Sequence, residues 1–387
     1  MANDDVRVIN RIMSHFAELP DPRQPLGKRH VLCDMLVIAI CAVICGAQGW
    51  SEVAEFGRSK RAWLATFLDL PHGIPSHDTF GRVFAALDPR ALERCFASWT
   101  GTLCDRSRGR LVSLDGKSIR RSFAHAWDAS GMTHLVSAFV AHNRLVLGQL
   151  SVDDPGAGGD RPRGNEITTI AKLLDLLDVS GATVSIDAIG CQRAVARQIV
   201  DRGADYVLCV KANQPALHAK LTRLLDEAIA DGQLALDRFD EVDGDHGRVE
   251  TRRVWASDRV RHLKLDEPWP SLASVACVER VREVIGGATS TERSYYVSSI
   301  ARATARALAG AIRGHWAIEN QLHWHLDVSF AEDACRIRTG HAAENFSRLR
   351  RIALNQLQRE RTLKGGIKTK RLKAGWDHDY LLTVLSA

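Results

Sequence analysis

Apolar residues recur at helical spacing through the first quarter of the chain, and prolines divide this stretch into short segments. Two segments, Ser51–Leu68 and Ser76–Leu87, flank the turn LPHGIP, with Ser76 in position to cap the second. The pattern predicts an all-helical N-terminal domain over residues 1–105. Within it, the two segments form either a helix-turn-helix that recognises DNA or an ordinary helical hairpin.

After Arg110 the pattern changes to short apolar strands. LVSLD, HLVSAFVAH and RLVLGQLSV predict an antiparallel meander, and helices then alternate with the strands TVSIDAIG and DYVLCVKAN. This order is typical of a ribonuclease-H-like mixed α/β sheet. We expect a ribonuclease-H-like catalytic domain over residues 106–387, with a β-rich insertion at about 214–300.

Two of these strands end in an aspartate, Asp115 in SLDGKSIR and Asp187 in VSIDAIGCQ. A carboxylate at the end of an apolar strand is costly unless something compensates its charge. Either aspartate alone could simply cap a strand or helix. In the predicted topology, however, the first and fourth strands lie side by side, so the two carboxylates should converge.

A third acid lies in the strong helical pattern that follows the insertion, from about Thr304 to Leu326. Glu319 falls within the apolar stripe of this helix, where a carboxylate needs a partner. His315 and His323 are eight residues apart, about 12 Å along a helix at ~1.5 Å per residue, which is too far for one shared zinc ion.

Asp115, Asp187 and Glu319 are three acids without a cysteine or histidine cluster, a set that favours Mg²⁺, with Mn²⁺ able to substitute. Two such ions ~4 Å apart can activate an attacking oxygen and stabilise a leaving one. Glu332 and Asp333 are rivals for the third position. The sequence therefore predicts a metal site suited to phosphodiester chemistry.

Composition and charge narrow the class of protein. The chain has 387 residues, 45% of them hydrophobic, which is enough for a packed core and excludes a disordered protein. The formal charge is +6, but residues 341–375 hold ten Lys and Arg against two Glu, so the basic character is concentrated there. This basic C-terminal segment predicts a polyanionic partner.

The cysteines and the longest apolar run indicate the compartment. Nine cysteines occur singly, and with no secretory leader they read as reduced thiols in a cytoplasmic protein. The run Met35–Cys45 has eleven residues, fewer than the ~18 needed to span a bilayer. We expect a buried core helix there and no membrane partner.

An ordered series of long phrases then identifies a family. SLDGKSIR, LGQLSV, TVSIDAIGCQ, DYVLCVKANQ, HGRVETR, RGHWAIENQLHWHLDVSFAEDACR and RRIALNQL, together with GIPSHDTFGRVFAALDP near the start, occur in this chain. They strongly resemble the H-repeat-associated, ISAs-type branch of insertion-sequence DDE transposases. The resemblance covers nearly the whole chain.

The resemblance implies a DDE triad, carried onto Asp115, Asp187 and Glu319, and an enzyme that cleaves transposon ends and transfers their 3′-hydroxyls into target DNA. It also implies a homo-oligomer in the synaptic complex. Relatives often place an Arg four residues before this Glu, where this chain has His315. Two alternatives stay open: a metal-dependent nuclease that does not join strands, and an inactive or domesticated DNA-binding protein.

Basic side chains are the expected DNA contacts, because phosphate binding supplies much of the affinity for DNA. Their alternative role is to keep the surface soluble. The expected contacts are Lys117, Lys211, His315, His323, Arg348, Arg350, Arg351, Lys368, Lys370, Arg371 and Lys373.

Overall fold

The computed structural model describes residue 9 and residues 11–104, 110–122, 132–152, 165–232, 234–245, 248–284 and 287–387. The chain divides into two compact units. Unit 1 comprises residues 1–105, 116–165 and 319–387, and unit 2 comprises residues 106–115 and 166–318. The chain therefore passes repeatedly between the units.

The strands form one mixed sheet in the order β3-β2-β1-β4-β5-β9-β8-β7-β6. β1 pairs in parallel with β4, and β4 in parallel with β5, whereas β2 pairs antiparallel with β3. The predicted meander and the alternation that follows it are thus confirmed. The strands are β1 (Leu111–Ser118), β2 (His134–Val140), β3 (Leu145–Ser151), β4 (Thr183–Ile186), β5 (Asp205–Val210), β6 (Asp237–Asp245), β7 (Arg248–Ser257), β8 (Ser274–Val284) and β9 (Thr289–Ser298).

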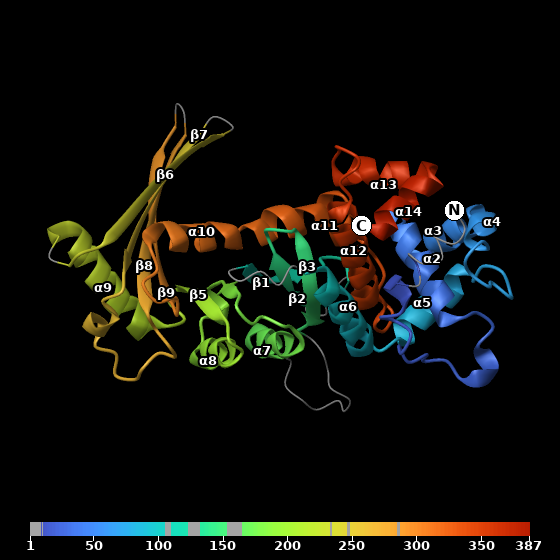
Figure 1. Ribbon diagram of the computed structural model, residues 1–387, viewed down its shortest axis with the longest axis horizontal. Coiled ribbons are helices and arrows are strands. Elements are labelled where there is room, and N and C mark those ends of the chain that lie inside the picture. Colours follow the sequence, from blue (N-terminus) through green and yellow to red (C-terminus); the bar gives the residue numbers. More distant parts are fainter. Residues whose placement is uncertain are drawn as a thin grey trace. The chain divides into compact units, whose positions relative to one another are not determined.

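Unit 2 contains the β-rich segment that was expected to be an insertion, as well as strands β4 and β5 and the first part of β1. β6 to β9 form an antiparallel set whose last strand pairs with β5. Because side chains alternate along a strand, one face packs against α10 through Val254 and Val278, and the opposite face presents Tyr295 to α9 (Figure 1). The helices of this unit are α7 (Glu166–Leu176), η3 (Ala188–Gly190), α8 (Arg193–Asp201), α9 (Pro215–Asp231), η4 (Val260–Leu263) and α10 (Ala305–His315).

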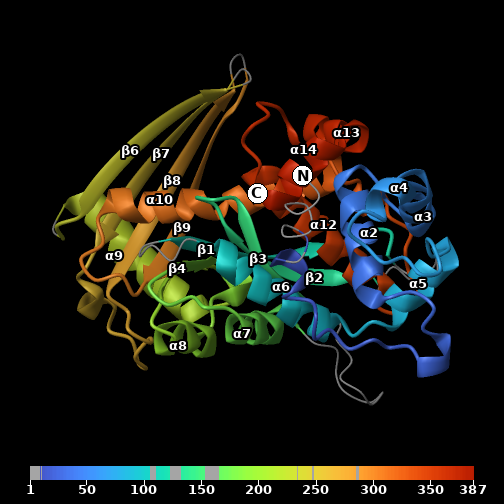
Figure 2. The same cartoon turned by 45° about the vertical axis from the view of Figure 1, so that its right-hand side comes forward.

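Unit 1 is mainly helical and is built around α12, which contacts α2, α5, α6, β3, α13 and α14 (Figure 2). Residues Met35–Ile44 of α2 are buried, as the apolar run predicts, and no described helix is long and apolar enough to cross a membrane. Its helices are η1 (Pro25–Gly27), α2 (Leu32–Ile44), α3 (Trp50–Ser59), α4 (Arg61–Leu64), α5 (His77–Ala86), α6 (Pro89–Leu103), α11 (Trp324–Val328), η6 (Glu332–Ala334), α12 (Ala342–Arg359), α13 (Ile367–Trp376) and α14 (His378–Ser386).

One predicted element is wrong in detail. The single helix expected from Thr304 to Leu326 is α10, a π-helix η5 (Ile318–His323) and the short α11. A π-helix has i→i+5 hydrogen bonds and so shifts the helical register. The apolar spacing alone does not reveal the π-helix, because Ile318, Leu322 and Leu326 keep a four-residue interval and are all buried.

Candidate active site

Asp115 and Asp187 follow the last paired residues of two neighbouring strands, although β1 itself does not end at Asp115 as predicted but continues to Ser118. In the parallel pair β1 and β4, Leu114 lies opposite Ile186, so the next residue on each strand is an aspartate. Both of these apolar residues are buried, which fixes the register of the pair. The carboxyl ends of parallel strands point the same way, and the two acids therefore emerge at one edge of the sheet.

Asp187 is held in place by the turn that follows it. Its carboxylate accepts a hydrogen bond from the backbone N–H of Ile189 at 3.1 Å and so caps η3. A Cβ at the buried Gly190 would lie 2.2 Å from Cγ2 of Ile186, so this turn requires glycine. Partial desolvation raises the pKa of Asp187, although the Ile189 N–H and the positive charge of Lys211 both oppose the rise. Cation binding would relieve that cost of desolvation.

A chain of polar side chains ties α10 to these strands. Oγ of Ser185 on β4 donates to Oγ of Ser113 on β1 at 3.1 Å and lies 3.0 Å from Nδ1 of His315. Desolvation lowers the pKa of His315 to about 4, with Ser185 opposing the shift, so the imidazole is neutral near pH 7. His315 was expected to contact DNA. The structure instead shows a half-buried ring bonded to Ser185.

Glycine allows α10 to approach the sheet closely at the same point. A Cβ on Gly314 would lie 2.4 Å from Cδ2 of Leu111, the first residue of β1. The helix therefore packs on β1 at Gly314 and bonds to β4 at His315, five and four residues before Glu319. Within unit 2, these contacts fix the direction in which the chain enters the π-helix.

Glu319 is exposed, which corrects the expectation that it lies in the buried stripe of its helix. Trp316, which also belongs to the apolar spacing of this helix, is 47% exposed and lies under the guanidinium of Arg280. Glu319 itself lies in the π-helix, whose i→i+5 hydrogen bonds change the direction of side chains relative to an α-helix. Single-turn π-helices occur often at functional sites.

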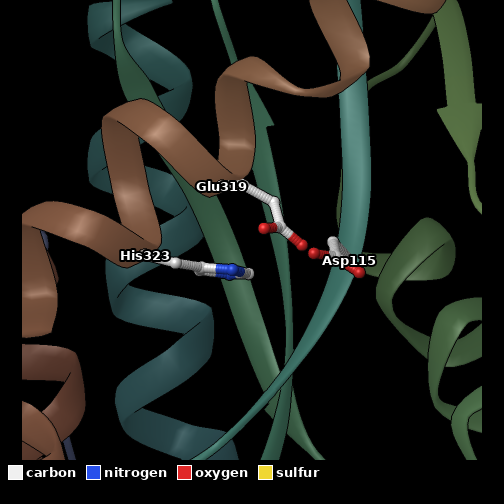
Figure 3. Close-up of side chains that lie close together, drawn as sticks. All are labelled: Asp115, Glu319 and His323. Atoms are coloured by element: carbon white, nitrogen blue, oxygen red, sulfur yellow. The ribbon is translucent and has the colours of Figure 1, made fainter. Parts of the chain in front are cut away.

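Asp115, Glu319 and His323 are the one group among the described residues whose side chains could together hold a metal ion. One ligand atom of each lies within 4.8 Å of the others (Figure 3). Asp115 ends a segment of unit 2, and Glu319 begins a segment of unit 1. His323 was expected only as a DNA contact, and Asp187 does not belong to this group.

The rival acids have other partners. Glu332 is fully buried, accepts a hydrogen bond from Ser347 at 2.7 Å and pairs with Arg351 at 3.0 Å. Burial acts to raise the pKa of Glu332, but Arg351 and Arg350 outweigh it, so the pKa is lowered. Its contacts make it a structural residue.

Asp333 is engaged by Lys117 at 3.3 Å and Arg120 at 3.1 Å. Lys117 also pairs with Asp327 at 2.8 Å, and its side chain is only 9% exposed. This lysine was expected to contact phosphate. The structure instead places its ammonium between two carboxylates, where it joins β1 to the segment after η5. Lys211, in contrast, is exposed after β5.

The expected DNA contacts on α12 are corrected by their burial. Arg348, Arg350 and Arg351 are at most 1% exposed. Arg348 pairs with Glu93 at 2.5 Å and with Glu344 at 3.1 Å. A buried, paired guanidinium is not available to phosphate without breaking the core.

The same correction applies to half of the α13 group. Lys370 is buried and donates to the carbonyl of Leu357 at 2.9 Å, and Arg371 donates to the carbonyl of Val43 at 2.9 Å. Lys373 lies over the ring of Tyr380 at 4.6 Å, and Lys368 is exposed. Of these four residues of α13, Lys368 and Lys373 keep the surface position that a DNA contact requires.

Sequence reasoning missed Ser113 and Ser185, although a signal for them was present. Each serine lies two residues before an aspartate, in VSLD and VSID. Residues two apart on a strand share a face, so the repeated spacing places each serine on the same side as its acid. Glu93 was missed as well, and no local pattern marks it as the partner of Arg348.

Family comparisons cover most of the chain. Residues 106–356 match the family described as Transposase DDE domain. Residues 13–100 match the family described as DDE_Tnp_1-associated.

Individual relatives match along nearly the whole chain. The chain is 35% identical to the "H repeat-associated putative transposase YhhI" of Escherichia coli (strain K12), covering 98% of each protein. It is 37% identical to the "Putative transposase YncI" of Escherichia coli O157:H7, over 98% of this chain and 95% of that protein. An uncharacterized protein in the dhlA 3′ region of Xanthobacter autotrophicus is 45% identical over 73% of this chain and 92% of its own length.

One solved structure bears a remote likeness. It is titled as a cryo-EM structure of the piggyBac transposase synaptic complex with hairpin DNA. The likeness covers 98% of this chain and 81% of that one, at 11% identity and a TM-score of 0.36. At that score it carries no argument here.

Proposed function

The chain belongs to the Transposase DDE domain family and is a DNA transposase, and from this premise we propose its chemistry. It cleaves phosphodiester bonds at transposon ends and transfers the freed 3′-hydroxyls into target DNA. Because two ends must be held together for joining, it acts as a homo-oligomer on paired ends. The observation that carries the proposal is the emergence of Asp115 and Asp187 at one edge of the sheet.

Asp115, Asp187 and Glu319 are the proposed catalytic residues and would hold Mg²⁺, or Mn²⁺ in its place. The donor set supports this, since carboxylate oxygens suit hard divalent cations and the raised pKa of Asp187 marks a carboxylate that gains from a nearby cation. His323 lies within reach as a further donor. Bound divalent ions supply Lewis-acid polarisation of phosphate oxygens and stabilise the leaving oxygen.

The chain's own residues position these acids. The bond from Ser185 to Ser113 joins β4 to β1 directly below the two aspartates, and His315 holds α10 against them. Removing residues that orient metal-binding side chains in this way typically lowers metal affinity or activity by about 10- to 100-fold. Lys211, near Asp187, is placed to attract the phosphate that the acids alone would repel.

The test uses labelled duplexes that carry the inverted repeats bordering the gene. The wild-type protein should nick them with Mg²⁺ or Mn²⁺ and join pre-cut ends to a target plasmid, and activity should survive a zinc-selective chelator. Asp115→Asn and Asp187→Asn should each abolish both steps. Glu227→Gln, an exposed acid on α9, is the matched control.

Retained cleavage in either aspartate variant would contradict the assignment of these residues. Cleavage without joining would leave a metal-dependent nuclease and remove the strand-transfer step from the proposal. DNA binding without either reaction would indicate an inactive DNA-binding protein.

A further inference from the structure

A groove of about 950 Å³ lies within unit 1, formed by residues other than the proposed catalytic ones. Its walls are the start of α3, the outer face of α5 and the segment Arg336–Gly340, which connects η6 to α12. Nothing in the proposed chemistry uses this groove.

The groove is positively charged. Arg82, Arg336 and Arg338 line it, together with His77, against a single acid, Asp78. Arg82 and Arg336 are exposed, and neither forms an ion pair within the described part of the chain. Arg348, Arg350 and Arg351 of α12 in the same unit are paired with glutamates, so Arg82 and Arg336 differ from them in being available to a ligand.

The two walls are locked together, so the groove is formed before anything binds. The backbone N–H of His341 donates to the carbonyl of Ala85 at 3.0 Å, and the side-chain amide of Asn345 donates to the carbonyls of Phe84 and Leu87. A Cβ on Gly340, which has a φ of +50°, would lie 2.6 Å from the Ala85 carbonyl oxygen. Only glycine permits this approach.

The α5 wall of the groove contains three small residues, Gly81, Ala85 and Ala86. Trp50, which also lines the groove, is held by stacking on Phe84 at 4.7 Å. The first turns of α3, α5 and α12 also reach the groove, and helix N-termini add positive potential. A preformed, shallow, basic groove suits a polyanionic chain better than a small ligand.

The groove wall is also linked to the segment that follows the first catalytic acid. Nε of Arg338 donates to the carbonyl of Arg121 at 3.0 Å, and Asp333 pairs with Lys117 and Arg120. These residues directly continue the chain from Asp115.

We propose that this groove binds the sugar-phosphate backbone of duplex DNA, with Arg82 and Arg336 as phosphate contacts. The proposal rests on the proposed function, because it assumes that DNA is the substrate. It assigns DNA binding to α5 and the 336–340 segment, in place of the buried arginines of α12.

The experiment measures binding of a fluorescein-labelled duplex of random sequence by anisotropy, in EDTA, at several salt concentrations. Without metal ions, the readout does not depend on catalysis. Arg82→Ala/Arg336→Ala should weaken binding by about tenfold or more at low salt and reduce the slope of log K against log salt by about 1 for each phosphate that the variant no longer neutralises. Arg94→Ala/Arg361→Ala, which removes two exposed arginines of the same unit outside the groove, should change neither.

A second variant leaves both arginines in place. Ser51→Glu adds a negative charge at the groove wall, in the first turn of α3, where an acid favours the helix. It should weaken DNA binding while the melting temperature holds or rises. If the groove variants and the control variant bind DNA equally well, the groove is not a DNA-binding site. The proposed cleavage by the acids would be unaffected by that result. If the groove variants lose DNA affinity as expected but the wild-type protein does not cleave DNA, the proposed chemistry is wrong and the groove proposal stands.

Discussion

Glu319 and Glu332 lie thirteen residues apart and have opposite surroundings. Glu319 is exposed on a π-helix beside Asp115 and His323. Glu332 is fully buried and is surrounded by guanidinium and hydroxyl groups that neutralise it. The charge of Glu332 is already compensated by Arg351 and Arg350, whereas Glu319 is exposed beside two other possible metal ligands. The charges around each glutamate therefore distinguish the two.

The same contrast separates the basic residues. Arg348 and Arg351 of α12 are internal counter-ions for Glu93 and Glu332, whereas Arg82 and Arg336 face the groove. A basic run in a sequence does not distinguish these cases. Charge on the surface binds partners, and charge in the core organises the fold.

The largest effect is expected at Glu319. Glu319→Gln should reduce cleavage by roughly a thousandfold or more, because several kcal/mol of transition-state stabilisation depend on bound metal. The melting temperature should change little, since the side chain is exposed. Single-turnover cleavage of a pre-bound duplex measures the loss. Activity within tenfold of wild type would remove Glu319 from the proposed triad.

Glu332→Gln tests the other member of the comparison. Removing one partner of a buried ion pair typically costs about 3–5 kcal/mol, because Arg351 and Arg350 would be left uncompensated. Urea unfolding should show this loss. The matched change Asp333→Asn, at a partly exposed acid, should cost less than half as much. Unchanged stability of Glu332→Gln would mean that the buried network is not a structural core.

His315 should give the protein a specific acid sensitivity. Its folded pKa of about 4 lies below the ordinary value of about 6.5, so its contribution to stability is complete above pH 6.5 and is lost as the pH falls toward 4. The loss approaches about 3 kcal/mol at the acid end. His315→Gln should flatten that part of the stability profile and lower cleavage more than DNA affinity. If the variant shows the same dependence of stability on pH as the wild type, protonation of His315 is not the cause of the acid sensitivity.

The smallest effect is expected on α13. Lys368→Ala should change stability by less than about 0.5 kcal/mol, whereas Arg371→Ala should destabilise the protein by about 1–3 kcal/mol because its bond to Val43 is buried. Thermal unfolding of both variants compares them directly. Equal effects would show that burial does not separate the two side chains.

The sheet was predictable because alternation and strand order act locally. Apolar strands fix which residues are internal, although β1 runs past Asp115 to Ser118, which the apolar pattern did not predict. The residue after Leu114 and the residue after Ile186 could thus be paired without any structure. The predicted domain boundary at residue 105 and the catalytic roles of the acids stay predictions.

The remaining features depend on contacts distant in sequence. Arg348 is internal because Glu93, 255 residues away, lies against it. The register shift at Glu319 depends on a π-helix that conserves apolar spacing. The groove forms because Gly340 meets Ala85 across more than half of the chain. None of these partners is visible in a local pattern.

The central place of α12 has a consequence for biosynthesis. The early helices α2, α5 and α6 bury apolar surface against a helix that begins at Ala342, so they cannot complete their packing when they leave the ribosome. A nascent chain must keep them soluble until most of it has been translated. A copy of the gene truncated before α12 should yield an aggregation-prone product that is cleared by proteases, not a partly competent DNA-binding fragment.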